Sequence, residues 1–84
     1  MRVKHSDPRV AFGRTLRKFR KAEGLSQEKL AELAGIHRTY IGDVERGKRN
    51  IALLNLVQLA KALKTPLSKL ISEMEKLNTH AGQI

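Results

Sequence analysis

Apolar residues recur along this chain every three or four positions, the spacing that places them on one face of an α-helix. Five stretches of this kind follow one another, separated by glycine, proline or short polar segments, and each predicts a helix. No stretch shows the strict alternation of apolar and polar residues that is typical of a half-buried strand. The predicted fold class is therefore all-α, with five helices in a single domain.

The first helix is marked at both ends. Asp7 followed by Pro8 favours a helix start, because Asp caps free amide groups and Pro fits the first helical position. Gly24 favours the left-handed conformation that often ends a helix. The side chains predicted to face inward in the first three helices are Phe12, Leu16 and Phe19, then Leu30, Ala31, Leu33 and Ala34, then Ile41 and Val44.

The second and third predicted helices are unusually close in sequence. The second starts after Ser26, and the third covers about 38–46, so only residues 35–37 separate them. Gly35 can take a positive φ without steric cost, and Ile36 can fill the corner between the helices. Two helices joined by so short a turn must cross steeply. The start of the third predicted helix is then held away from the body of the domain, where it can enter the major groove of DNA.

Two further helices complete the domain. Thr65 and Pro66 repeat the pattern of a cap followed by proline and open the fifth helix. The predicted apolar faces consist of Leu53, Leu56, Val57, Leu59, Ala60 and Leu63 in the fourth helix, and of Leu67, Leu70, Ile71, Met74 and Leu77 in the fifth.

The chain of 84 residues is strongly basic, with a formal net charge of +9 and a pI near 10.5. Such a charge favours a polyanionic partner, with nucleic acid first and an anionic membrane or acidic protein next. The positive charge is concentrated before residue 25, where eight Lys and Arg face two acidic residues. A membrane-surface role for the first helix is disfavoured because its apolar face is small.

The composition excludes several classes of chemistry. There is no Cys, so disulfides, thiolate metal sites and cysteine nucleophiles are excluded, and the three His are scattered. No arrangement of catalytic residues and no glycine-rich phosphate loop is visible. We therefore expect neither an enzyme nor a cofactor. No apolar run long enough to span a bilayer and no secretory signal is present, so a cytoplasmic protein is expected.

The segment "SQEKLAELAGIHRTYIGDVERGKRN", together with the preceding "FGRTLRKFRKAEGL" and the later "LAKAL", resembles the Cro/C1-type (XRE-like) helix-turn-helix repressors. This family includes phage repressors, antitoxins and the controller proteins of restriction–modification systems, and "RTYI…VERGKRN" is most similar to the controller proteins. The resemblance implies a lambda-repressor-like DNA-binding domain over 8–78, with the helix-turn-helix at about 26–46. A basic arm over 1–7 and a flexible tail over 79–84 are expected to flank it.

Base readout is predicted at the start of the third helix. Arg38 can bond to guanine O6 and N7, and Thr39 can contact a base through its methyl or hydroxyl group. Asp43 has three open interpretations: it accepts a bond from cytosine N4, it holds Arg38 or Arg46 in one rotamer, or it is a solvated acid. Gly42 either allows close approach to DNA or is a neutral position, and it is unusual because glycine inside a helix costs about 1 kcal/mol relative to alanine.

Phosphate contacts are predicted around this helix. The resemblance implies that Gln27 contacts the DNA backbone and braces the recognition helix, whereas Ser26 serves mainly as a cap. Tyr40 either reaches a phosphate through its hydroxyl or packs beside Ile36, and His37 is either a helix cap or a phosphate neighbour. The predicted phosphate-contact set is Gln27, His37, Tyr40, Lys48, Arg49 and Asn50.

Two further sets of residues are predicted to have structural roles. The resemblance implies an ion pair between Arg20 and Glu45, whereas the sequence itself shows only that both charges flank core positions. On the fifth helix a domain of this size would leave an apolar stripe exposed, although Ile71 can also belong to the core. We therefore predict a two-fold dimer whose interface contains Ile71, Met74 and Leu77.

The function predicted first is a sequence-specific regulator of transcription that binds double-stranded DNA as a homodimer. The alternative is an antitoxin that also binds a toxin protein, although the chain offers almost no tail for such a partner.

Overall fold

The computed structural model describes residues 7–82, and it confirms the all-α prediction. The described residues form five helices without a strand: α1 Pro8–Ala22, α2 Gln27–Ala34, α3 Arg38–Glu45, α4 Leu53–Ala62 and α5 Leu67–Gly82. The predicted basic arm, apart from Asp7, lies outside the described residues, as do residues 83 and 84. None of the described helices is both long enough and apolar enough to cross a membrane.

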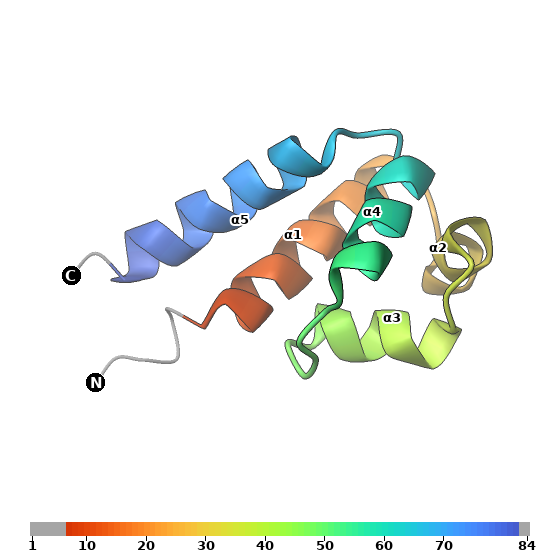
Figure 1. The fold of residues 1–84 in the computed structure, drawn as a ribbon, viewed down its shortest axis with the longest axis horizontal. Helices are drawn as coiled ribbons and strands as arrows, with labels where there is room; N and C mark the ends of the chain where they lie inside the picture. Colours follow the sequence, from red (N-terminus) through yellow and green to blue (C-terminus); the bar gives the residue numbers. More distant parts are fainter. Residues whose placement is uncertain (1–6, 83–84) are drawn as a thin grey trace.

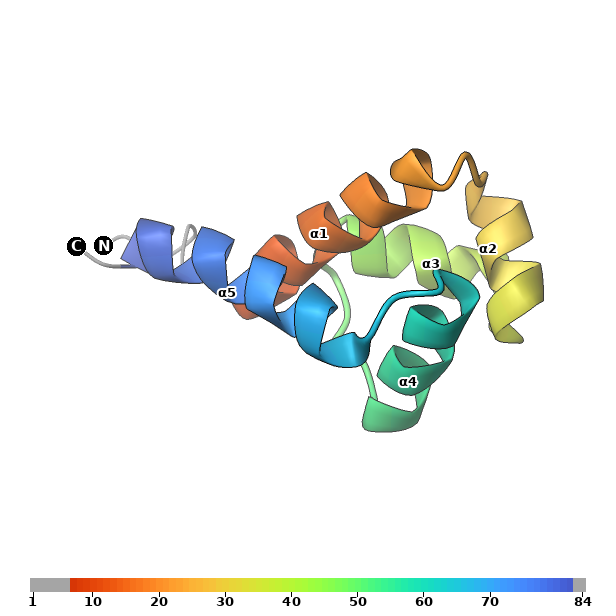
Figure 2. The same cartoon turned by 90° about the horizontal axis from the view of Figure 1, so that it is seen from above.

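Helix α1 is the central element of the domain. It packs against α5 on one side and α3 on another, while α2 packs against α3 and α4. Figure 1 shows α3 along the lower edge of the molecule, and Figure 2 shows α2 and α3 together at the end that is far from the last turns of α5. The helix-turn-helix therefore forms one end of the domain and leaves part of α3 at the surface.

The predicted start signals of α1 and α2 are confirmed. The Asp7 side chain accepts a hydrogen bond from the Arg9 amide at 2.9 Å, and the Ser26 hydroxyl accepts one from the Lys29 amide at 2.9 Å. Helix α5 begins one residue after Pro66, whose carbonyl accepts the amide of Lys69 at 2.9 Å. These local bonds satisfy amide groups that a helix cannot satisfy within its own first turn.

The core is mainly aliphatic, as predicted, and is built where α1, α2, α3, the second half of α4 and the start of α5 meet. Phe12 is the only aromatic side chain among the buried residues that the structure describes, and Phe19 is partly buried against the core. The buried cluster contains Phe12, Leu16, Leu30, Ala31, Ala34, Ile41, Val44, Leu59, Ala60, Leu63 and Leu70.

Two leucines predicted to lie inside are exposed instead. Leu33 is 52% exposed, because the inner side of α2 carries Ala31 and Leu33 points about 200° away from it around the helix. Leu53 is 70% exposed although it shares a helix face with Ala60. It stands about two turns before Ala60, beyond the end of the core. For α4, helical periodicity identified the inner face but not the length over which that face is covered, whereas for α2 the prediction put Leu33 on the wrong face.

The end of α5 also differs from the prediction. The helix continues to Gly82, where a tail from residue 79 was expected. The reason is local: after Pro66 there is no proline and no glycine before Gly82, so no residue breaks the helix earlier. Met74 also differs, because it is partly buried against the core rather than left free by the domain.

Candidate nucleic-acid interface

The turn between α2 and α3 explains why the two helices can be so close in sequence. Gly35 ends α2 in the left-handed conformation, with φ of 70°. The amide of Ile36 then bonds to the carbonyl of Ala31 at 2.9 Å, and its side chain packs against the core. The chain therefore changes direction sharply over residues 35–37, and α3 starts at Arg38.

The first turn of α3 is open to solvent. His37 stands at the cap position with extended backbone, and its side chain makes no capping hydrogen bond. His37, Arg38 and Thr39 are all exposed, whereas Ile41 and Val44 on the opposite side of the helix are buried. The predicted base-reading residues Arg38 and Thr39 are thus presented together on one exposed helix end.

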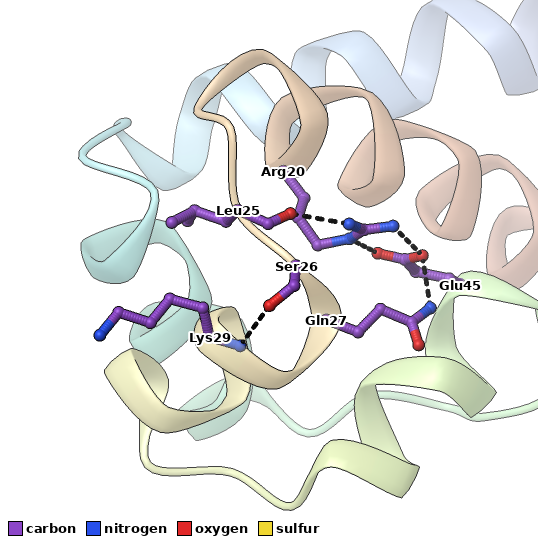
Figure 3. Close-up of polar contacts among 6 residues, drawn as sticks. All are labelled: Arg20, Leu25, Ser26, Gln27, Lys29 and Glu45. Atoms are coloured by element: carbon purple, nitrogen blue, oxygen red, sulfur yellow. Dashed lines mark hydrogen bonds and ion pairs between the residues drawn. The ribbon is translucent and has the colours of Figure 1, made fainter.

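The predicted partners Arg20 and Glu45 form a two-pronged ion pair between α1 and the end of α3. Arg20 Nε lies 2.6 Å from Glu45 Oε2, and Nη2 lies 3.0 Å from Oε1. The remaining Nη1 donates to the carbonyl of Leu25 at 2.8 Å, as Figure 3 shows. The side chains of Arg20 and Glu45 are only 10% and 3% exposed. The hydrogen bonds to the Glu45 carboxylate raise the pKa of the Arg20 guanidinium above its ordinary value, despite the opposing effect of burial.

Gln27 joins this ion pair at the start of α2. Its Nε2 donates to Glu45 Oε1 at 2.9 Å (Figure 3). Its amide oxygen lies near Gly42, since a Cβ placed on Gly42 would be 3.7 Å from Gln27 Oε1. The side chain therefore braces α3 directly, which is one of the two roles that the resemblance implied. The space above Gly42 is occupied by the side chains of Gln27 and Arg46.

The Asp43 carboxylate is paired with two arginines, Arg46 and Arg49. Of these, only Arg46 was named as a partner in the sequence-based interpretations of Asp43. Its Oδ1 lies 2.6 Å from Arg46 Nη2, and its Oδ2 lies 3.3 Å from Arg49 Nε. The Arg49 guanidinium also lies over the ring of Tyr40, 5.0 Å from its centroid.

Tyr40 itself is partly buried and packs against the core, as Ile36 does. Lys48, Arg49 and Asn50 are exposed on the loop that follows α3.

Sequence reasoning missed the importance of Gly13. A Cβ at this position would lie 2.5 Å from the carbonyl oxygen of Val44 and 2.7 Å from that of Glu45. The absent side chain lets α1 touch the backbone at the end of α3, next to the Arg20–Glu45 pair. The sequence did contain a signal for this contact. Glycine inside a helix is unfavourable, so a glycine there commonly marks a place where another element packs closely against the helix.

The predicted dimer residues are not one exposed stripe. Ile71 and Met74 are half-buried and line a cavity of about 160 Å³ together with Phe12, Ile51 and Leu56. Leu77 is exposed. Among the side chains whose exposure the structure describes, the most exposed large apolar pair is Leu53 and Leu54 at the start of α4, at 70% and 69%. The apolar pattern predicted that Leu53 belongs to the core, and it gave no prediction for Leu54.

No group of three or more His, Cys, Asp or Glu that can hold a metal ion occurs within the part of the chain that the structure describes. The side chains around the exposed end of α3 offer guanidinium, amide, hydroxyl and ammonium donors together with the carboxylate of Asp43.

Known proteins share this architecture. A family model described as helix-turn-helix matches residues 16–70. The control protein C.SmaI of Serratia marcescens is 48% identical over 66 residues, which cover 79% of each chain. The control protein C.MunI of a Mycoplasma species is 42% identical over 72 residues, 84% of this chain and 97% of the relative. The crystal structure of the restriction–modification controller protein C.AhdI from Aeromonas hydrophila superposes with a TM-score of 0.73 at 52% identity, covering 74% of this chain and 94% of that one.

Proposed function

The chain belongs to the helix-turn-helix family of DNA-binding transcriptional regulators that includes the restriction–modification control proteins, and from this premise we propose that it binds a two-fold symmetric operator as a homodimer. In this proposal α3 enters the major groove and the protein regulates transcription by occupying its site, without catalysis or a cofactor. Its place of action is the cytoplasm, where its DNA target lies. We propose the domain as residues 8–78, with the helix-turn-helix at about 26–46.

One observation carries the proposal most directly: the exposed first turn of α3 is fixed to the body of the domain. Glu45 at the other end of α3 bonds to Arg20 of α1 and to Gln27 of α2, so the helix cannot rotate without breaking these contacts. A rigid support gives the exposed side chains Arg38 and Thr39 a defined register against base edges. We propose phosphate contacts for Gln27, His37, Tyr40, Lys48, Arg49 and Asn50.

The test is selection from random duplex DNA with the purified protein at about physiological salt, where non-specific binding is weak. Enrichment of a two-fold symmetric site, with half-sites about one helical turn apart, is the expected result. Binding that shows no sequence preference and simply disappears as salt rises would contradict the proposal.

Arg38→Ala is expected to remove discrimination at one base pair of each half-site. A bidentate Arg–guanine contact contributes roughly 1–3 kcal/mol of discrimination. Repeating the selection with the variant measures this directly, because the consensus should become degenerate at one position and stay unchanged elsewhere. Arg17→Ala is the matched control: Arg17 is exposed on α1, and its loss is expected to leave the consensus intact. An unchanged consensus for Arg38→Ala would exclude Arg38 from base readout.

We place the proposed dimer interface at the start of α4. Leu53 and Leu54 are adjacent, strongly exposed and apolar, which is unusual for a surface without a partner. Ile51, two positions before Leu53, and Leu56, two positions after Leu54, line the same cavity as Ile71 and Met74. A second copy seated on Leu53 and Leu54 would therefore adjoin part of the stripe predicted on α5.

Leu53→Ala is expected to raise the dimer dissociation constant by about 10- to 150-fold for each copy of Leu53 that the interface buries, because burying a leucine contributes roughly 1.5–3 kcal/mol and every 1.4 kcal/mol is tenfold. Sedimentation velocity over a range of concentrations measures the change. Leu33→Ala is the control, since Leu33 is also exposed but lies on α2. Leu77→Ala shows whether the interface extends along α5. An equal effect of the Leu33 and Leu53 variants would contradict this interface.

A further inference from the structure

We propose that Asp43 is a specificity-determining residue that acts through Arg46 and Arg49. Its carboxylate competes with DNA phosphates for these two arginines and so weakens binding to non-specific DNA more than binding to the operator. This inference rests on the proposed function and gives one residue of the interface a defined role.

The geometry shows a carboxylate whose two oxygens serve different arginines. Oδ1 accepts from Arg46 at 2.6 Å and Oδ2 from Arg49 at 3.3 Å. The Asp43 side chain is only 22% exposed, while both arginine side chains are about half exposed. Partial burial raises the pKa of Asp43, but the hydrogen bonds from Arg46 and Arg49 outweigh it and the net pKa lies below the ordinary value. The carboxylate is therefore charged at neutral pH and offsets part of the local positive charge.

Each arginine has a second feature that holds it beside Asp43. The Arg49 guanidinium is also placed over the ring of Tyr40. The Arg46 guanidinium also lies over the backbone at Gly42, where a Cβ would be 3.4 Å from Arg46 Nη1. The amide of Lys48 bonds to the carbonyl of Asp43 at 2.9 Å, so the same residue also anchors the loop that carries Arg49. Both arginines are thus positioned before any DNA arrives.

Non-specific and specific binding respond differently to this arrangement. Non-specific affinity comes almost entirely from phosphate neutralisation, so a carboxylate that occupies two arginines lowers it directly. At the operator α3 lies deeper in the major groove, where the Asp43 carboxylate can accept a bond from an exocyclic base amine such as cytosine N4. The arginines can then turn to phosphates while the carboxylate remains satisfied. In this way the base-contact and arginine-holding roles of Asp43 belong to one mechanism.

The experiment measures the affinity of Asp43→Asn for the selected operator and for a scrambled duplex across a range of salt concentrations. Affinity for the scrambled duplex is expected to rise by about fivefold near 0.15 M salt, and the salt slope to steepen by about 0.9, as for one additional phosphate contact. The ratio of specific to non-specific affinity should fall. Glu32→Gln is the matched control, because Glu32 is an exposed carboxylate paired with Lys29 on α2. It carries the same charge change and should leave the ratio unchanged.

Adding Asp43→Asn to an Arg46→Ala/Arg49→Ala variant tests the mechanism further, and there it should no longer raise non-specific affinity. Unchanged non-specific affinity and slope for Asp43→Asn, with a loss confined to the operator, would overturn the proposal and leave Asp43 a base-contact residue alone. Equal effects of Asp43→Asn and Glu32→Gln would overturn it in favour of a general charge effect. A wild-type protein without any sequence preference would instead refute the proposed function itself, so the two failures are distinguishable.

Discussion

Replacing Arg20 by alanine is expected to lower the free energy of unfolding by about 3–5 kcal/mol, because it breaks a buried ion pair while leaving one partner in place. Glu45 would keep a charged side chain that is 3% exposed and would lose both of its guanidinium donors. The carbonyl of Leu25 would lose its donor as well. The remaining bond from Gln27 to Glu45 cannot compensate for these losses, because an amide carries no charge.

Thermal or urea unfolding of Arg20→Ala and Lys21→Ala measures this effect with a control from the next position of α1. Lys21 is exposed, so its removal is expected to change the free energy of unfolding by less than about 0.5 kcal/mol. For a domain of this size the difference corresponds to more than about 10 °C in Tm. Equal melting temperatures for the two variants would contradict a stabilising role for the pair.

Most helix boundaries could be predicted because the signals that set them are local. Asp7 and Ser26 bond to amides two and three residues ahead, and Gly35 alone supplies the left-handed turn, so a short stretch of sequence contains each cause and its effect. The ion pair is different. Arg20 and Glu45 are 25 positions apart, and only the resemblance to a known family brought them together before the structure did.

Other features depend on distances that no local pattern contains. Leu53 has the right helix face to be buried, but α4 extends past the end of the core. Asp43 has arginines three and six positions ahead. Arg46 was named with Arg38 in one of its three open interpretations, whereas only the path of the loop brings Arg49 back to it. Ile71 and Met74 were predicted to lie in a dimer interface, with the core as the alternative for Ile71. Both line a cavity together with residues of α1, α4 and the loop before α4, and the size of that cavity cannot be read from periodicity.

Gly13→Ala and Gly42→Ala are expected to change stability in opposite directions although the substitution is the same. At position 13 the new Cβ would lie 2.5 Å and 2.7 Å from two backbone oxygens of α3, and no rotamer change can relieve contacts with backbone. Helix α3 would have to move away from α1, which would also stretch the Arg20–Glu45 pair. The expected cost is about 3 kcal/mol or more, at the upper end of what overpacking usually causes.

At position 42 the nearest atom to the new Cβ is the end of the Arg46 side chain, at 3.4 Å. That flexible group can shift slightly, so the better helix propensity of alanine should dominate and raise stability by up to about 1 kcal/mol. Unfolding of both variants, measured side by side, tests the argument. A Gly13→Ala protein as stable as the wild type would show that α3 does not need this close contact with α1. The rigid support for the exposed end of α3, on which the proposed DNA readout depends, would then have to come from the ion pair and Gln27 alone.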